Sequence, residues 1–166
     1  RLKIFQGERC LELLYHDTCH SASDIAVHLP EEKTVFCGDY VFYKNAPLGL
    51  DSSFVNWIRA LDKLAALRAD HYVPGHGPVC GVDGLLEAKG YLELVYREAE
   101  KRYRAGMPPG DAALDIDLGQ YKDWHCTERI LANVARLYQE FAGEAPTTAI
   151  DTDSLMAEMD RLASRG

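Results

Sequence analysis

The sequence predicts a mixed α/β fold built in layers, with strands at the start of the chain and helices after them. Runs rich in Val, Ile, Leu, Phe and Tyr fill the first forty residues, and such runs are typical of strands. From Asp51 onward, apolar residues recur three and four positions apart, which is the period of an amphipathic helix. Strands followed by helices indicate a sheet covered by helices.

Four strands are expected before residue 40. In the third of them the larger apolar residues alternate with smaller or polar ones, so one face of that strand is buried. Pro30-Glu31-Glu32-Lys33 supplies a turn into the fourth strand, so the two form a hairpin. The predicted strands are Leu2–Gln6, Cys10–Tyr15, Asp24–Leu29 and Lys33–Cys37.

Helices dominate the remainder, interrupted by one short buried strand at His71–Val73. The first helix follows Asp51. The second, Gly84–Ala105, ends at Gly106 with Pro108-Pro109 just beyond, which is typical stop chemistry. Two further amphipathic helices are predicted at Ile130–Phe141 and Leu155–Leu162, with 143–153 as the linker between them.

Charge and composition exclude several classes of partner. The chain has 26 acidic and 18 basic residues and a net charge of −8, which disfavours binding to a phosphate backbone, so no nucleic-acid partner is expected. No apolar run reaches the ~20 residues that span a bilayer, so no membrane is expected either. Five cysteines at irregular spacing do not form a disulfide framework and favour a cytoplasmic location. Because the chain begins with Arg1, a leader lost upstream stays open.

Three segments at predicted strand ends carry metal-competent side chains. They are His16–Ser21, Cys37–Asp39 and Pro74–Pro78, and loops at strand ends are where a rigid scaffold presents reactive groups. Imidazole and carboxylate are ligands that suit zinc, iron or manganese. Glycines before Asp39 and on both sides of His76 let the backbone come close to an ion.

These motifs resemble the metallo-β-lactamase fold superfamily, whose later motifs are a His-Thr pair after a strand, a Gly-Asp at the end of the next, and a Pro-Gly-His-Gly turn. Residues 14–39, LYHDTCHSASDIAVHLPEEKTVFCGD, are similar to the family's strand, ligand histidine, hairpin and Gly-Asp, although Ser21 replaces the usual threonine. Residues 73–77 are similar to the family's last ligand turn. The resemblance covers residues 2–142, with the motifs in the family's order.

The resemblance implies an αββα sandwich with a C-terminal helical extension. It assigns His20 to a first metal site, Asp39 to a bridging or second-site position, and His76 to the second site. The family's earliest motif, His-x-His-x-Asp-His, is absent from these 166 residues, which implies that the first half of the sandwich is missing. Residues 1–143 are then the C-terminal half with its helical extension, and 144–166 a linker and terminal helix.

The function implied is that of a metal-dependent hydrolase of small molecules. One or two ions, zinc or alternatively iron or manganese, would lower the pKa of a bound water from 15.7 to about 7, and the hydroxide would attack an ester, thioester or amide carbonyl. Full metal binding would need upstream sequence. Two alternatives stay open: a di-iron redox protein of the same fold, and a non-catalytic binding or assembly fragment.

The missing half also has a packing consequence. A lone sheet would expose its apolar inner face. We therefore expect the chain to pair with the missing N-terminal half or to self-associate.

Other reactive side chains are expected to have structural roles. His16 is expected near the site or at the surface, His28 to point outward into solvent, and His71 to open a buried strand. Cys19 and Cys37 are expected to be small buried apolar groups despite lying beside His20 and Asp39. By the resemblance, the region of Tyr121, Trp124 and Glu128-Arg129 packs beside the active site. Tyr121 and Trp124 could shape the pocket there, but plain packing is favoured for both. His125-Cys126 and the Asp-rich connector 111–117 are not expected to bind metal.

Overall fold

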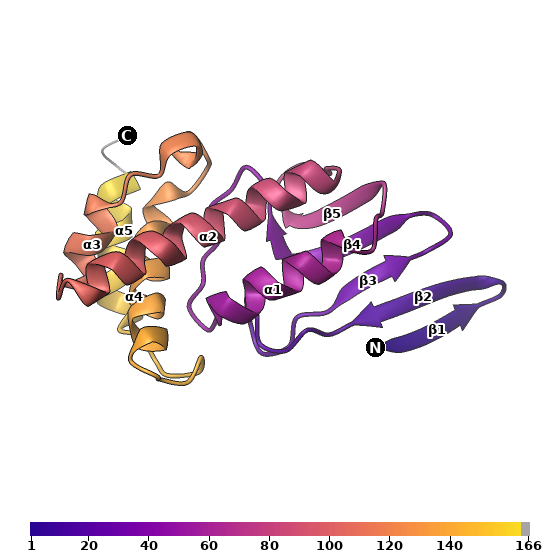
Figure 1. Ribbon diagram of the computed structural model, residues 1–166, viewed down its shortest axis with the longest axis horizontal. Coiled ribbons are helices and arrows are strands. Elements are labelled where there is room, and N and C mark those ends of the chain that lie inside the picture. The colour runs from indigo at the N-terminus through magenta and orange to yellow at the C-terminus, as the bar shows by residue number, and fades with distance from the viewer. Residues whose placement is uncertain (164–166) are drawn as a thin grey trace.

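The computed structural model describes residues 1–163, in which a five-stranded sheet carries helices on one face (Figure 1). The strands lie in chain order across the sheet; the first four are antiparallel to their neighbours, and the last pairs in parallel with the fourth. The strands are β1 (Leu2–Gln6), β2 (Arg9–Leu14), β3 (Ala26–Leu29), β4 (Thr34–Phe42) and β5 (His71–His76).

The helices form two groups. The first two lie across the sheet, and the remaining three pack around the far end of the second (Figure 1). The helices are α1 (Phe54–Ala65), α2 (Val82–Arg104), α3 (Pro109–Asp115), α4 (Ile130–Phe141) and α5 (Thr152–Ala163), with short 3₁₀ turns η1 (Gly119–Tyr121) and η2 (Thr127–Arg129). No helix within residues 1–163 combines the length and apolar character needed to cross a bilayer.

Most elements match the expected ones, and three differ. β4 continues to Phe42 instead of ending at Cys37, and β5 continues to His76 instead of ending at Val73, because the later parts of the two strands pair with each other. Helix α3 covers part of the Asp-rich connector, where no helix was predicted. Pro109 occupies its first turn, a position that proline favours, and its buried residues Ala112 and Ala113 pack in the helical group.

The core lies between the sheet and the first two helices. Val35 of β4 and Tyr72 of β5 are paired neighbours and fully buried. Trp57 of α1 is 1% exposed, and its indole Nε1 donates to the carbonyl of Tyr40 at 2.8 Å. A buried indole that keeps a hydrogen-bond partner contributes its apolar area without the penalty of an unpaired donor.

The N-terminus of α1 is capped from a distant helix. Glu140 of α4 accepts hydrogen bonds from the backbone N–H groups of Phe54 at 2.9 Å and Val55 at 3.3 Å, and from the Ser53 hydroxyl at 3.2 Å. Ser53 is the N-cap residue and accepts from the Asn56 N–H. Donors that have no partner within the helix are thereby satisfied.

The opposite face of the sheet is apolar and carries no helix. One row of paired residues crosses all five strands on this face, and it is open to solvent at Leu2, which is 59% exposed, and at Phe36, which is 47% exposed. The row consists of Leu2, Leu13, Val27, Phe36 and Val73. The expectation of an open apolar sheet face is therefore met within the described residues.

His28 differs from its expected outward position, because it is only 8% exposed. It pairs across the sheet with Glu12 and Val35, on the face that carries buried Val35. Its ring nitrogen Nδ1 lies 3.0 Å from the Glu12 carboxylate, which is also contacted by Arg1 and Lys3.

Glu12 makes stability depend on pH. The hydrogen bond from Arg1, together with weaker ones from His28 and Lys3, outweighs the opposing effect of burial and lowers the pKa of Glu12 from 4.5 to about 2. Because the folded state favours the charged form, its stabilising contribution is complete above pH 4.5 and is lost as the pH falls through about 2.

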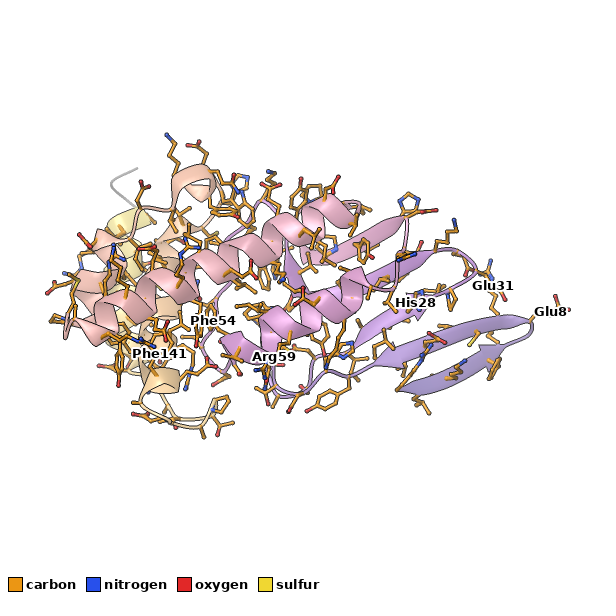
Figure 2. The ribbon with its side chains drawn as sticks, viewed as in Figure 1. Glu8, His28, Glu31, Phe54, Arg59 and Phe141 are labelled. Carbon is orange, nitrogen blue, oxygen red and sulfur yellow. The ribbon has the colours of Figure 1, made fainter. Side chains whose placement is uncertain are left out.

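Replacing Glu12 with Gln should therefore lower the free energy of unfolding at pH 6 and have progressively less effect as the pH falls from 4.5 to 2. Denaturant titrations at a series of pH values measure this difference. Glu8→Gln, at the exposed hairpin tip (Figure 2), controls for the loss of one negative charge. A difference between wild type and Glu12→Gln that stays constant across this range would contradict the assignment.

Candidate metal centre

The three predicted ligands line one pocket of about 300 Å³. His20 comes from the loop between β2 and β3, Asp39 from β4, and His76 from the end of β5. These positions lie at the end of the sheet opposite the hairpin turns marked by Glu8 and Glu31 in Figure 2. The pocket is lined by His20, Ser21, Asp39, Phe42, Leu48, Leu50, Asp51, His76 and Arg129.

Asp39 lies between the two imidazoles. Its Oδ2 is 3.8 Å from His20 Nδ1, and its Oδ1 is 3.5 Å from His76 Nε2. The side chains of His20, Asp39 and His76 are 22%, 39% and 48% exposed. All three donors are therefore reachable from the pocket.

Phe42 orients both imidazoles and was not expected to take part in the site. Its ring stacks on His76, with centroids 4.6 Å apart and planes inclined by 14°. On the other side it lies 5.4 Å from the ring of His20. Trp57 contacts the His20 ring edge-on at 5.4 Å. The extension of β4 beyond Cys37 places Phe42 between the two imidazoles. The apolar run Tyr40-Val41-Phe42 was the signal in the sequence that the strand continues.

Two glycines allow β5 to approach β4 closely. A Cβ at Gly75 would lie 2.1 Å from Asp39 Oδ1, and a Cβ at Gly77 would lie 1.8 Å from the carbonyl oxygen of Tyr43. Gly77 also has φ of +96°, a backbone conformation that side chains disfavour. The Tyr43 N–H donates to the His76 carbonyl at 2.9 Å. The glycines on both sides of His76 thus allow β5 to lie against β4 and Tyr43.

Asp24 is a second carboxylate near His20. Its Oδ1 lies 3.8 Å from His20 Nδ1, and it accepts from the Ser21 N–H at 2.6 Å and the Ser21 hydroxyl at 2.8 Å. Burial alone would raise the pKa of Asp24, yet the nearby His20 imidazole and the hydrogen bonds from Ser21 outweigh burial and lower it. An ionised carboxylate behind an imidazole fixes the orientation of the ring. No motif in the sequence had indicated that Asp24 lies at the site.

Arg129 reaches the pocket from the helical extension. The segment before η2 is joined to the β4–α1 connection by a bridge between Asn45 and His125. The Ala46 N–H donates to the His125 carbonyl at 2.8 Å, and the His125 N–H donates to the Lys44 carbonyl at 3.1 Å. The resemblance placed Glu128-Arg129 beside the site, but nothing in the local sequence marked Arg129 as pocket-lining.

His20, Asp39 and His76 provide donor atoms of the types that bind a divalent ion, but three side chains are too few to enclose one. Two imidazoles and a carboxylate are the nitrogen and oxygen ligands that zinc takes in hydrolytic sites. Within residues 1–163 no group of three or more His, Cys, Asp or Glu side chains forms a ready-made metal cluster. The trio is linked only through Asp39, at distances longer than hydrogen bonds. The fit is therefore one of chemistry and placement, with further ligands still needed.

The nearby thiols are excluded from the pocket. Cys19 and Cys37 are fully buried, as expected. Burial raises the pKa of each thiol to about 12, so both stay neutral and poor as ligands.

Tyr121 and Trp124 do not line the pocket and instead pack in the core. Trp124 is 7% exposed and stacks on Tyr91 with centroids 5.5 Å apart, while Tyr121 meets both rings edge-on. This agrees with plain packing, the favoured alternative for the pair, and Arg129 lies next to the pocket instead. His16 is half-buried and does not line the pocket, and His71 is exposed although its strand neighbour Tyr72 is buried.

The part of the chain that forms the sheet matches a known protein family. Residues 2–76 match the metallo-beta-lactamase superfamily. The matched segment contains all five strands and all three predicted ligands. The resemblance read from the sequence is thereby confirmed.

Solved structures with the metallo-β-lactamase fold are similar to this chain. A metallo-beta-lactamase from Pontibacter korlensis is 27% identical with a TM-score of 0.52, over 55% of this chain and 45% of that one. A metallo-beta-lactamase family protein from Thermus thermophilus gives 18% identity and a TM-score of 0.61, over 86% of this chain and 48% of that one. The sec-alkylsulfatase Pisa1 from Pseudomonas sp. gives 16% identity and a TM-score of 0.66, over 89% of this chain and 26% of that one. The chain thus spans less than half the length of each.

The close approach at Gly77 can be tested by substitution. Gly77→Ala should destabilise the protein by at least about 2 kcal/mol, because the added Cβ would clash with the Tyr43 carbonyl and the positive φ would be strained. Gly110→Ala, in α3 with open space around it, should change stability by less than about 1 kcal/mol. Thermal denaturation of both variants measures this; equal stabilities would contradict the stated contact.

Proposed function

We propose that this chain contributes to a metal-dependent hydrolase in which His20, Asp39 and His76 hold one or two divalent ions, with zinc as the expected metal. The observation that carries the proposal is the position of the Asp39 carboxylate between the two imidazoles, inside a pocket large enough for part of a small substrate. The superfamily match over residues 2–76 supports the same assignment.

The protein groups around this trio hold the ligands in place. Asp24 lies 3.8 Å from Nδ1 of His20, the nitrogen that also faces Asp39, and Phe42 fixes the plane of His76 by stacking. Asp39 presents one oxygen toward each histidine, which suits a bridging or second-site role. A bound divalent ion would supply a Lewis acid and lower the pKa of a coordinated water.

The reaction proposed is hydrolysis of an ester, thioester or amide carbonyl. No Ser or Cys nucleophile is needed for it, and the buried, neutral Cys19 and Cys37 are unsuited to that role. Leu48, Leu50 and Phe42 form apolar walls next to the ligand trio. These walls would hold the uncharged part of a substrate and exclude water around the reacting carbonyl.

Metal binding can be tested with a matched pair of histidine variants. His76→Ala should weaken zinc binding by the full-length chain at least about tenfold, whereas His71→Ala should leave it unchanged because His71 is exposed and outside the pocket. Competition with a chromophoric chelator measures the affinity, and elemental analysis identifies the metal. Iron in place of zinc would favour the redox alternative.

Equal zinc affinities of wild type and His76→Ala would refute the ligand role. Absence of stoichiometric metal, even after the chain is combined with the N-terminal half of a metallo-β-lactamase fold, would favour a non-catalytic assembly module.

We further propose that the open apolar face of the sheet packs against a second sheet. That sheet would come from an N-terminal half of the fold or from another copy of the chain. The row from Leu2 to Val73 supports this proposal, since it leaves the large apolar side chains of Leu2 and Phe36 exposed to solvent.

Light scattering tests this packing. The chain alone should form dimers or larger species, and Phe36→Lys should shift the population toward monomer. Leu86→Lys, which replaces a similarly exposed apolar residue on α2, should leave the association unchanged. A monodisperse wild-type monomer would count against the proposal.

A further inference from the structure

We propose that Arg129 recognises a carboxylate on the substrate, so that the site prefers anionic substrates with a short apolar stretch between the carboxylate and the reacting carbonyl. This inference rests on the hydrolase function proposed above and adds the class of substrate. It assigns a specificity role to a residue of the helical extension.

The guanidinium of Arg129 is held at the pocket by one of its nitrogens. Nη1 donates to the Ala46 carbonyl at 2.9 Å and to Asn45 Oδ1 at 3.2 Å. Nε and Nη2 make no hydrogen bond or ion pair with any residue in the described range 1–163. An anchored guanidinium with a free edge is suited to bind a carboxylate through two parallel hydrogen bonds.

The other charges of the pocket leave this role to Arg129. It is the only Lys or Arg among the residues that line the pocket. The nearby Lys44 does not compete, because its ammonium pairs with Glu87. Of the two acidic lining residues, Asp39 lies between the histidines, and Asp51 is exposed to solvent.

The apolar lining sets the form of the substrate. Leu48 and Leu50 belong to the connection between β4 and α1, the same connection to which Arg129 is anchored at Asn45 and Ala46. Because Arg129, the leucines and the ligand trio line one pocket, a substrate with its carboxylate at Arg129 and its carbonyl at the trio would place its apolar part against the leucines.

Binding of simple probes tests the inference without requiring turnover. Hexanoate and hexanamide have the same chain and differ in charge. Titrating each into the full chain, freed of metal on a chelating resin, and following the imidazole NMR signals of His20 and His76 should give roughly tenfold tighter binding of hexanoate. Arg129→Gln should abolish this preference, and Arg129→Lys should retain part of it.

Two controls separate charge from structure. Arg59→Gln removes an exposed arginine from α1, outside the pocket (Figure 2), and should keep the preference. Asn45→Ala removes one anchor of Arg129 while retaining its charge and the bond to Ala46, and should also keep most of it. Thermal melting of each variant verifies folding.

The proposal is overturned if hexanoate binds no better than hexanamide, if hexylammonium binds more tightly than hexanoate, or if Asn45→Ala loses the preference as fully as Arg129→Gln. Zinc binding without anion preference would refute this inference and leave the hydrolase proposal standing. Anion preference without any zinc binding would refute the hydrolase proposal and leave Arg129 as part of a carboxylate-binding pocket.

Discussion

The parallel pairing of β4 with β5 is the constraint on which the site depends. Gly38 pairs with Pro74 and Phe42 pairs with His76, with register shifts between them. The carboxyl ends of parallel neighbours meet at one edge of a sheet, so Asp39, Phe42 and His76 are brought together by backbone hydrogen bonding alone. The glycine at position 75 permits this approach, since any larger residue would occupy the place of the Asp39 carboxylate.

The candidate site separates hard and soft donors by burial. Two thiols lie within two residues of the proposed ligands, yet both point into the core and remain protonated. The imidazoles and the carboxylate face the pocket instead. Borderline and hard ions such as zinc, iron and manganese match this set better than ions that require thiolate. Regular alternation would place Cys37 and Asp39 on the same face of β4, so the register shifts on either side of Gly38, which has φ of +52°, are what separate the buried thiol from the carboxylate.

Local patterns were enough to predict the strands, most helices and the three ligand candidates, because turn residues and apolar periodicity act over a few positions. Features that depend on contacts between distant segments were missed. His28 is buried because it pairs with Glu12. The position of Arg129 was indicated only by the family resemblance, because it depends on the bridge that joins His125 to Asn45. The family resemblance left a pocket role open for Trp124, whereas stacking on Tyr91, thirty-three positions away, holds it in the core.

The carboxylate of Glu140 has a consequence for how the protein unfolds. It satisfies the first backbone donors of α1, which lies on the sheet, although it belongs to α4 in the helical extension. If the extension detached, those donors would lose their acceptor, and the start of α1 would fray beside the loop that carries His20. We therefore expect the sheet layer and the extension to melt in one cooperative transition, with hydrogen-exchange protection of Phe54 and Val55 reporting on α4 as much as on α1.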